Sequence, residues 1–512
     1  MKNDAVVYDV AIVGYGPAGQ VAAALLGQRG LKVYVCERLT DVYQIPRAIA
    51  LDHEIMRVFQ QIGVVDAIAP YTEPFTNSEY YGVDGQLIRR MTMVPPPYPQ
   101  GYTPSIVFTQ PPVERALRER VAQLSNVKVA LGVEMRELSQ DDEGVTLYID
   151  ANGKREAVRA RYAIACDGGS SGVRTQLGIE MEDLDFDEPW LVVDVLVNEQ
   201  GLTKLPKVSV QYCEPERPCT LVIGPKNHRR WEISILPGED PKEVATPEQT
   251  WKLLSRWLDP QDGELWRQAS YRFHALVATR WRQGRVFLAG DAAHMQPPFL
   301  GQGMCQGIRD VSNLSWKLAA VLQDEVKGGA AQALLDSYGV ERQAHVRELT
   351  SRIKAVGAVI CERDPVQARQ RDARLLAECD GVVRDTPRQD ILPALDQGLL
   401  SSTPSSGRGR LFPQPLLAGK GGEPRRMDLY SGNGWRLVLA PKVLPERAAF
   451  GCISPVLLEE GDDPEGIATD WFGRHECRAA LVRPDNYVYG VARSEADVVA
   501  LCGEALQALG MR

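Results

Sequence analysis

The amino-terminal segment, where an apolar run meets three closely spaced glycines, constrains the fold more than any other. Residues 8–13 are apolar and rich in β-branched side chains, and the string GYGPAG follows them directly at residues 14–19. An Ala/Leu-rich stretch continues to Gly30, and a second apolar run at residues 32–36 ends at Glu37. A strand-length run, a helix-length stretch and another strand-length run predict a βαβ unit, and hence a parallel sheet.

The glycines of this unit each meet a separate requirement of a nucleotide-binding turn. Gly14 permits the tight turn, Gly16 lets the backbone approach a pyrophosphate, and Gly19 allows close packing of helix against strand. Glu37 ends the second strand, where its carboxylate can bind a ribose hydroxyl. A lone GxGxxG string is weak evidence, but the strand, helix, second strand and acid occur here in the required order, which predicts a dinucleotide site. The residues assigned to the turn are Gly14, Gly16, Pro17, Ala18 and Gly19.

Two later segments repeat the pattern of an apolar run that ends in an acid and glycines. The string YAIACDGGSSGVR at residues 162–174 places Asp167 at the end of a predicted strand. GRVFLAGDAAHMQPPFLGQGMCQG at residues 284–307 places Gly290 and Asp291 in the same way. In a parallel sheet both turns would lie at the edge that holds the first glycine turn, and Asp291 could accept hydrogen bonds from sugar hydroxyls. Such turns also occur without a ligand, so each alone leaves a purely structural role open.

The end of this last segment predicts an anion-binding helix terminus. Gly301, Gly303 and Met304 lead into an apolar-periodic stretch at residues 308–318, which predicts a helix. Backbone amides at the start of a helix stabilise negative charge. The Pro297-Pro298 step just before them is expected to brace the loop.

Composition excludes several classes of protein. The net charge of −9 and the absence of a block of basic residues argue against nucleic-acid or anionic-membrane binding. Residues 1–9 lack the apolar core of a signal peptide, and no apolar run is long enough to span a bilayer, so we expect a cytoplasmic protein. The ten cysteines include no CxxC pair and no His/Cys cluster at metal-ligand spacing, which predicts reduced thiols and no metal site.

The region between the Asp167 and Asp291 turns predicts an inserted antiparallel sheet that could cover a pocket. Its strand candidates are residues 190–197, 208–212, 220–224 and 230–236. Most side chains on such a sheet pack or face water. Those best suited to meet an aromatic acid are Tyr212, His228, Arg230 and Trp231.

Three motifs together resemble the fingerprints of the single-component (class A) flavoprotein aromatic hydroxylases. They are GYGPAG with Glu37-Arg38, ACDGG with Arg174, and RVFLAGDAAHMQPPFLGQGMCQGIRD, and the resemblance spans roughly residues 8–349. PRAIALDHEIMRVFQQIG and PPFLGQGMCQGIRDVSNLSWKL are most similar to the 3-(3-hydroxyphenyl)propionate hydroxylase branch.

The resemblance implies an FAD-dependent monooxygenase that uses NADH or NADPH and dioxygen. Its expected reaction is hydroxylation of a phenol ortho to the existing hydroxyl, with a 3-hydroxyphenylpropionate-like acid as one candidate substrate. A heteroaromatic or halogenated phenol is an alternative substrate. An NAD(P)H oxidase or reductase on the same scaffold is an alternative activity, and a non-catalytic interaction protein is a third possibility.

The resemblance also assigns roles to residues. Gly14, Gly16 and Gly19 would meet the FAD pyrophosphate, Glu37 the adenosine ribose, and Asp291 the ribityl chain. Arg38, Arg47 and Gln110 would lie near the adenosine and ribityl portions, and Asp167 belongs to the motif linked with both FAD and the nicotinamide. Pro297 would brace the loop beside the reactive carbon of the flavin. A base near the phenol hydroxyl would help the reaction, and the candidates are His53, Tyr212 and His228.

The implied fold is α/β with three parts. A Rossmann-like FAD-binding domain would comprise residues 1–180 and 276–400, and a β-sheet substrate domain residues 181–275. Residues 401–512 resemble the thioredoxin-like tail of larger family members. Because Cys452, Cys477 and Cys502 stand alone there, we expect a structural or homodimer-forming role for the tail rather than disulfide exchange.

Overall fold

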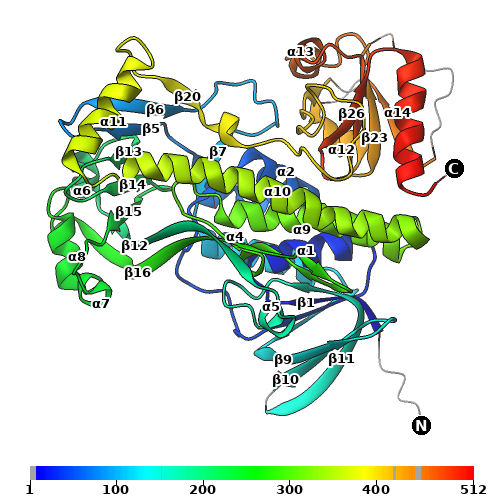
Figure 1. Ribbon diagram of the computed structural model, residues 1–512, viewed down its shortest axis with the longest axis horizontal. Coiled ribbons are helices and arrows are strands. Elements are labelled where there is room, and N and C mark those ends of the chain that lie inside the picture. The colour runs from blue at the N-terminus through cyan, green and yellow to red at the C-terminus, as the bar shows by residue number, and fades with distance from the viewer. Residues whose placement is uncertain (1–6, 152, 419–422, 442, 444–450, 512) are drawn as a thin grey trace.

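The computed structural model describes residues 7–151, 153–418, 423–441, 443 and 451–511. The chain has a mixed α/β fold in which one long helix, α10 (Gly328–Ile360), runs across the molecule between two large sheets and a smaller carboxyl-terminal unit (Figure 1).

The first sheet has the strand order β17-β18-β11-β1-β2-β8, and β10 and β9 extend it from β11. The β18-β11, β11-β1, β1-β2 and β2-β8 pairs are all parallel. Its strands are β1 (Val7–Val13), β2 (Val33–Glu37), β8 (Val127–Leu131), β9 (Val133–Gln140), β10 (Val145–Ala151), β11 (Lys154–Ala165), β17 (Arg282–Gln283) and β18 (Val286–Leu288).

The predicted βαβ unit is present as β1, α1 (Pro17–Gln28) and β2. Val10 and Ile12 are fully buried, as expected for a strand that is covered on both faces of a parallel sheet. Proline at the first helical position suits α1, because that residue has no intrahelical hydrogen bond to donate. The helix packs against α4 (Gln110–Ala122) and against α9 (Gly303–Leu322), so all three lie beside the same sheet.

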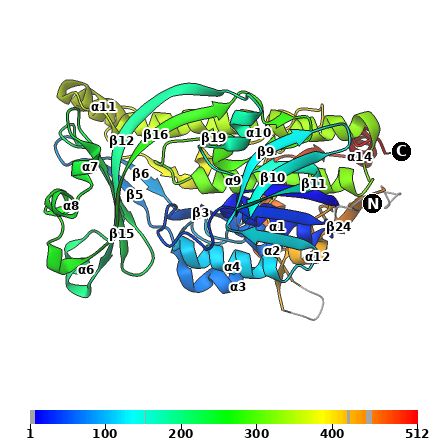
Figure 2. The same ribbon diagram turned by 90° about the horizontal axis from the view of Figure 1, so that it is seen from below.

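The second sheet has the order β19-β16-β12-β15-β14-β13-β5-β6-β20. It contains the predicted strands of the middle region and also takes in segments from earlier and later in the chain. Helices α6 (Glu199–Lys204), α7 (Pro241–Val244) and α8 (Pro247–Leu254) lie on one side of it, whereas α9 and β3 (Ala50–Asp52) lie on the other (Figure 2). The strands are β5 (Ser78–Tyr81), β6 (Leu87–Thr92), β12 (Met181–Val197), β13 (Ser209–Tyr212), β14 (Cys219–Ile223), β15 (His228–Ser234), β16 (Gly263–Ala278), β19 (His294–Met295) and β20 (Asp385–Pro387).

The carboxyl-terminal unit is a four-stranded sheet of order β24-β23-β25-β26, with α13 (Ile467–Arg474) and α14 (Glu495–Ala508) packed against it. Ser494 caps α14 by accepting a hydrogen bond from the Asp497 amide, which explains why the helix begins there. All three cysteines of this unit are free thiols. The strands are β23 (Trp435–Leu439), β24 (Ile453–Leu457), β25 (Ala479–Val482) and β26 (Val488–Ala492).

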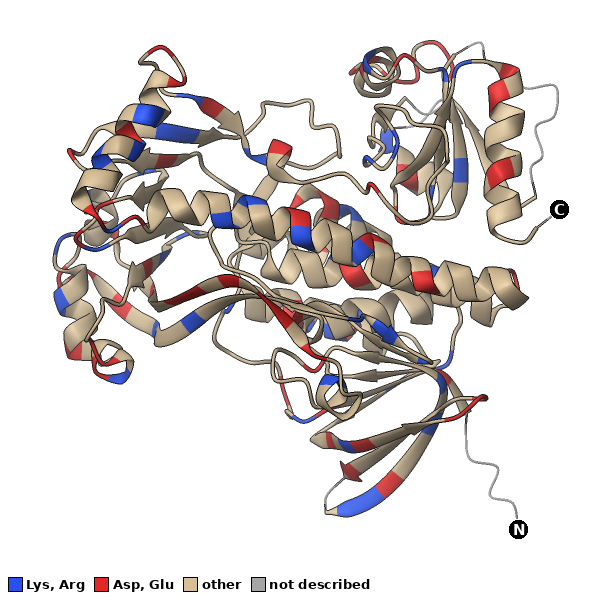
Figure 3. Ribbon diagram, viewed as in Figure 1, with Lys and Arg blue, Asp and Glu red and all other residues tan. Residues whose placement is uncertain are grey.

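Charged residues of both signs are interspersed over the elements (Figure 3). Within the described ranges, no helix has both the length and the apolar character needed to cross a membrane. The same residues contain no cluster of three or more His, Cys, Asp or Glu side chains that could hold a metal ion.

Candidate active site

Three turns meet at one edge of the first sheet. The Cys166 amide donates to the Val13 carbonyl over 2.7 Å, and the Ala289 amide donates to the Ala165 carbonyl over 2.9 Å. These bonds continue the parallel ladder to the carboxyl ends of β1, β11 and β18. The glycine turn after β1 and the acid-glycine turns after β11 and β18 therefore lie side by side, which is where open α/β sheets bind ligands.

The glycines of the first turn differ in what surrounds them. A Cβ on Gly14, whose φ is +97°, would lie 2.3 Å from the Cys166 carbonyl oxygen, and a Cβ on Gly19 would lie 2.1 Å from the Gly14 oxygen. No described atom would lie within 4 Å of a Cβ on Gly16. Gly14 and Gly19 are thus required by the protein's own packing, whereas Gly16 faces open space that a pyrophosphate can enter.

Glu37 is held at the end of β2 by two backbone amides. Its carboxylate accepts hydrogen bonds from Tyr15 N at 2.7 Å and from Leu39 N at 2.8 Å. The adjacent Arg38 is exposed. A carboxylate oxygen has two lone pairs, so acceptor capacity remains for a ribose hydroxyl.

Gln110 at the start of α4 fixes the segment that carries Arg47. Its Oε1 accepts from Arg47 N at 2.7 Å and from Ala48 N at 2.6 Å, while its Nε2 donates to Glu114 Oε1 at 2.7 Å. Gln20 of α1 donates to the other oxygen of Glu114 at 3.0 Å. The Arg47 side chain is exposed beside the Tyr43 ring. Sequence reasoning did not find Glu114, which joins this segment to the glycine turn.

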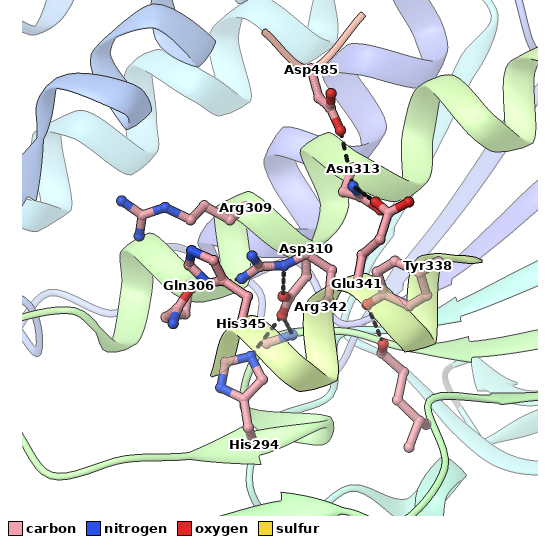
Figure 4. Close-up of polar contacts among 12 residues, drawn as sticks. His294, Gln306, Arg309, Asp310, Asn313, Tyr338, Glu341, Arg342, His345 and Asp485 are labelled. Atoms are coloured by element: carbon pink, nitrogen blue, oxygen red, sulfur yellow. Dashed lines mark hydrogen bonds and ion pairs between the residues drawn. The ribbon is translucent and has the colours of Figure 1, made fainter. Parts of the chain in front are cut away.

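The loop after β18 is organised by a buried carboxylate on α9. Asp310 accepts from Gly290 N at 2.9 Å, from His294 Nε2 at 2.7 Å and from Arg342 Nε at 3.0 Å (Figure 4). His294 thus positions the loop. Asp291 is solvent-accessible, although the protein atoms around it raise the pKa of its carboxyl. No described residue donates a hydrogen bond to the Asp291 side chain, so it is free to meet a ligand.

The amino terminus of α9 has no side-chain cap. Gln302 occupies the N-cap position without a capping hydrogen bond, and Gly301 before it has a φ of +63°. The first amides of this 20-residue helix are therefore available to an anion, with the helix dipole behind them. Pro297 is buried just ahead of them, and Gly303 and Met304 are half-buried.

Asp167 accepts hydrogen bonds within its own turn. It accepts hydrogen bonds from Ser171 Oγ at 2.6 Å and from Val173 N at 3.1 Å at the start of α5 (Gly172–Gln176). Arg174 donates to the Ala292 and Gly169 carbonyls at 3.0 and 2.8 Å, and so ties the second turn to the third.

These features fit FAD. The open space at Gly16 suits the pyrophosphate, Glu37 and Asp291 offer acceptors to two sets of sugar hydroxyls, and the uncapped end of α9 suits an anionic flavin edge.

Comparison with known proteins decides the family. A model of the FAD binding domain family matches residues 7–353. A probable NADH-specific resorcinol 4-hydroxylase of Rhodococcus jostii (strain RHA1) is 37% identical over 520 residues, which cover 98% of this chain and 95% of that protein. The chain belongs to the FAD-dependent aromatic hydroxylases. A 3-(3-hydroxy-phenyl)propionate/3-hydroxycinnamic acid hydroxylase of Escherichia coli (strain K12) is 32% identical over 516 residues, covering 94% of this chain and 91% of that one.

The fold of this hydroxylase is also shared with solved structures. The flavin-dependent monooxygenase PieE, in complex with FAD and substrate, superimposes with a TM-score of 0.82 at 21% identity, over 99% of this chain and 100% of that one.

The three predicted base candidates of the hydroxylase lie apart. His53, buried at the start of α2 (His53–Ile62), has its pKa lowered to about 4 by burial. His228 Nε2 lies 2.7 Å from Asp194 Oδ1, and the His228 ring packs against Trp266. The Tyr212 hydroxyl accepts from Trp257 Nε1 at 3.1 Å on the side of the sheet covered by α8.

A row of polar side chains on the other side of this sheet escaped sequence reasoning. Cross-strand pairing places the row on one face, because directly paired residues point the same way. Glu232 is buried in it, and burial raises the pKa of its carboxyl to about 7. The signal that could have found Glu232 is its alternation along β15 with Trp231 and Ile233, which are buried on the opposite side of the sheet, under α8. The row consists of Glu232, Thr220, Gln211, Tyr80 and Arg89.

Proposed function

We propose that this chain hydroxylates a phenolic ring at the carbon beside the existing hydroxyl. The phenol, dioxygen, NAD(P)H and one proton would give the dihydroxylated product, NAD(P)⁺ and water. The observation that carries the proposal is the convergence of the Gly16 turn, Asp291 and the uncapped α9 terminus at one sheet edge, next to a loop packed on the polar face of the second sheet. The named activities of the two relatives, on resorcinol and on hydroxyphenylpropionate, support a phenol as substrate.

FAD, when bound, supplies the electron transfer and the activation of oxygen. The residues of the chain bind and orient it: the Gly16 turn at the pyrophosphate, Glu37 at the ribose and Asp291 at the ribityl chain. The α9 amides offset negative charge at the flavin edge. Pro297 and Phe299 are buried in the loop before α9, where they would help to exclude water from the reacting ring.

We propose that the chain has three parts with different roles. Residues 1–180 and 276–400 form a Rossmann-like FAD-binding domain, residues 181–275 contribute the substrate sheet, and residues 401–512 form a thioredoxin-like unit without redox cysteines. We further propose that the enzyme is cytoplasmic and forms a homodimer. The elution volume of the purified protein would test the dimer.

Isotope labelling tests the function. The purified holoenzyme would be supplied with NADH or NADPH, ¹⁸O-labelled dioxygen and one phenol at a time. The panel would contain resorcinol, 3-(3-hydroxyphenyl)propionate, a chlorophenol and a hydroxypyridine. We expect one labelled oxygen in a product whose new hydroxyl is ortho to the first. Stoichiometric hydrogen peroxide without labelled product across the panel would instead establish an NAD(P)H oxidase.

A further inference from the structure

Glu232 differs from the neighbouring buried carboxylate Asp194 because no described side chain is paired with its charge. It is 7% exposed, and none of the described residues forms a hydrogen bond or ion pair with its side chain. The neighbouring Asp194 shows the contrast, since it is paired with Arg230 at 2.7 Å and with His228. A buried charge without a partner is costly, so a carboxylate in this state points to a ligand or a proton as its counterpart.

The face that carries Glu232 looks toward the proposed flavin loops. Trp190 lies on the same face, and its ring packs edge to face on Phe299 of the 297–301 loop at 5.6 Å. Val222, also on this face, packs with Ile49 and Ala50. Arg230 donates to the Arg47 carbonyl at 2.8 Å. Glu232 therefore lies between the segment that carries Arg47 and the loop that leads into α9.

The immediate neighbours of Glu232 are suited to a hydroxylated ring. Val192 and Thr220 flank it on the adjacent strands. The Thr220 hydroxyl is hydrogen-bonded to Gln211 Oε1, which leaves the Gln211 amide group to donate elsewhere. An apolar side chain, a hydroxyl, an amide and a carboxylate thus follow one another across the face.

We propose that Glu232 is the proton acceptor for the hydroxyl of the phenolic substrate, an assignment that rests on the proposed function. The phenol O–H bond breaks, its electron pair stays on the oxygen, and the proton bonds to a Glu232 carboxylate oxygen. The ring becomes more electron-rich and accepts oxygen more readily at the adjacent carbon. When the ring loses its carbon-bound proton to solvent, the oxyanion of the product takes back the proton from Glu232, so the side chain is unchanged overall.

The charges around Glu232 set the pH at which it acts. Burial and the Asp194 carboxylate raise the pKa of Glu232, whereas Arg230 and Arg267 lower it, with a result of about 7. A base must be deprotonated to act, so product formation should rise with pH through about 7 and fall away below it.

The test compares Glu232→Gln and Glu232→Asp holoenzymes with wild type, using the phenol that gives the most labelled product. We expect Glu232→Gln to lower the hydroxylation rate roughly 100-fold or more. FAD content and NADH oxidation should persist, with reducing equivalents diverted to hydrogen peroxide. The inflection near pH 7 should disappear in Glu232→Gln and persist in Glu232→Asp. Glu239→Gln, which removes a carboxylate just beyond β15 that is paired with Arg217, is the matched control and should behave as wild type.

Two results would overturn the assignment. Coupled hydroxylation by Glu232→Gln within about threefold of wild type would show that the carboxylate is not the acceptor. So would an unchanged pH profile in that variant. A wild-type enzyme that hydroxylates no phenol would instead contradict the proposed function itself, and with it the role of Glu232.

Discussion

In the first turn, two of the three glycines are required by packing, and the third is free to serve ligand binding. Gly14 and Gly19 have backbone oxygens where a side chain would go, whereas Gly16 has open space. The spacing of the three glycines predicts a nucleotide turn, but it does not reveal that packing occupies the space beside Gly14 and Gly19 and leaves it open beside Gly16.

Gly16→Val should therefore uncouple binding from stability. Gly16 has extended backbone angles, with a φ of −74°, so valine adds no backbone strain. We expect FAD affinity to fall at least about tenfold, equivalent to about 1.4 kcal/mol, with the melting temperature of the apoprotein unchanged. Gly14→Val is the contrasting variant and should destabilise the apoprotein itself by more than about 2 kcal/mol. Equal FAD affinity in Gly16→Val and wild type would remove the pyrophosphate from this turn.

Asp291→Ala tests the ribityl contact. The side chain is exposed and receives no hydrogen bond from the described residues, so its loss should leave the apoprotein as stable as wild type. A hydrogen bond to a charged acceptor contributes about 1.5–3 kcal/mol, which predicts at least tenfold weaker FAD binding in a fluorescence titration. Unchanged affinity would assign the ribityl chain to another residue.

Elements formed by neighbouring residues were predicted from the sequence, whereas the pairing of strands that lie far apart in the chain was not. The βαβ unit follows from local periodicity, and its second strand ends at Glu37 as predicted. The pairing of β13 with β5 joins residues more than a hundred positions apart, and no local pattern encodes it. The polar row that contains Glu232 was not predicted as a row for the same reason. Glu232 lies on β15, and the other members lie on four different strands.

The burial of His53 at the start of α2 should make the stability of the protein depend on pH. Burial lowers the pKa of His53 from 6.5 to about 4, with nearby Arg309 and Arg57 acting in the same direction and Asp52 opposing them. Between these values the unfolded chain binds a proton that the folded chain does not, so stability falls as the pH drops from 6.5 toward 4.

His53→Gln removes this contribution. Over that interval the wild type should lose about 3 kcal/mol more of its unfolding free energy than the variant does. Denaturant unfolding at pH 7, 6, 5 and 4 measures the difference. Parallel pH profiles for the two proteins would show that His53 is protonated in the folded state as readily as in the unfolded one.

At the scale of the molecule, buried ion pairs fasten the carboxyl-terminal unit to the rest of the chain. Arg483 contacts Glu341 of α10 at 2.7 Å and Asp485 at 2.6 Å. Asn313 of α9 donates hydrogen bonds to the same two carboxylates (Figure 4). A second buried contact joins Arg57 of α2 to Asp428 at 2.8 Å. The partners of Arg483 on α10 and of Asp485 on α9 cannot be found from the sequence, because contacts between residues this far apart leave no periodic pattern.

Arg483→Met tests whether this fastening stabilises the whole enzyme. The substitution would leave Glu341 and Asp485 buried with one fewer cation, and breaking a buried pair in this way costs about 3–5 kcal/mol. Arg493→Met is the matched control, because Arg493 pairs with Glu476 on the surface, where such a pair is worth about 0–1 kcal/mol. Denaturant midpoints of the two variants measure the contrast. A double variant, Arg483→Met with Asp485→Asn, should recover part of the loss, since Asp485 forms an ion pair with no described cation other than Arg483. If Arg483→Met unfolds at the same midpoint as Arg493→Met, the buried pairs of Arg483 do not stabilise the enzyme.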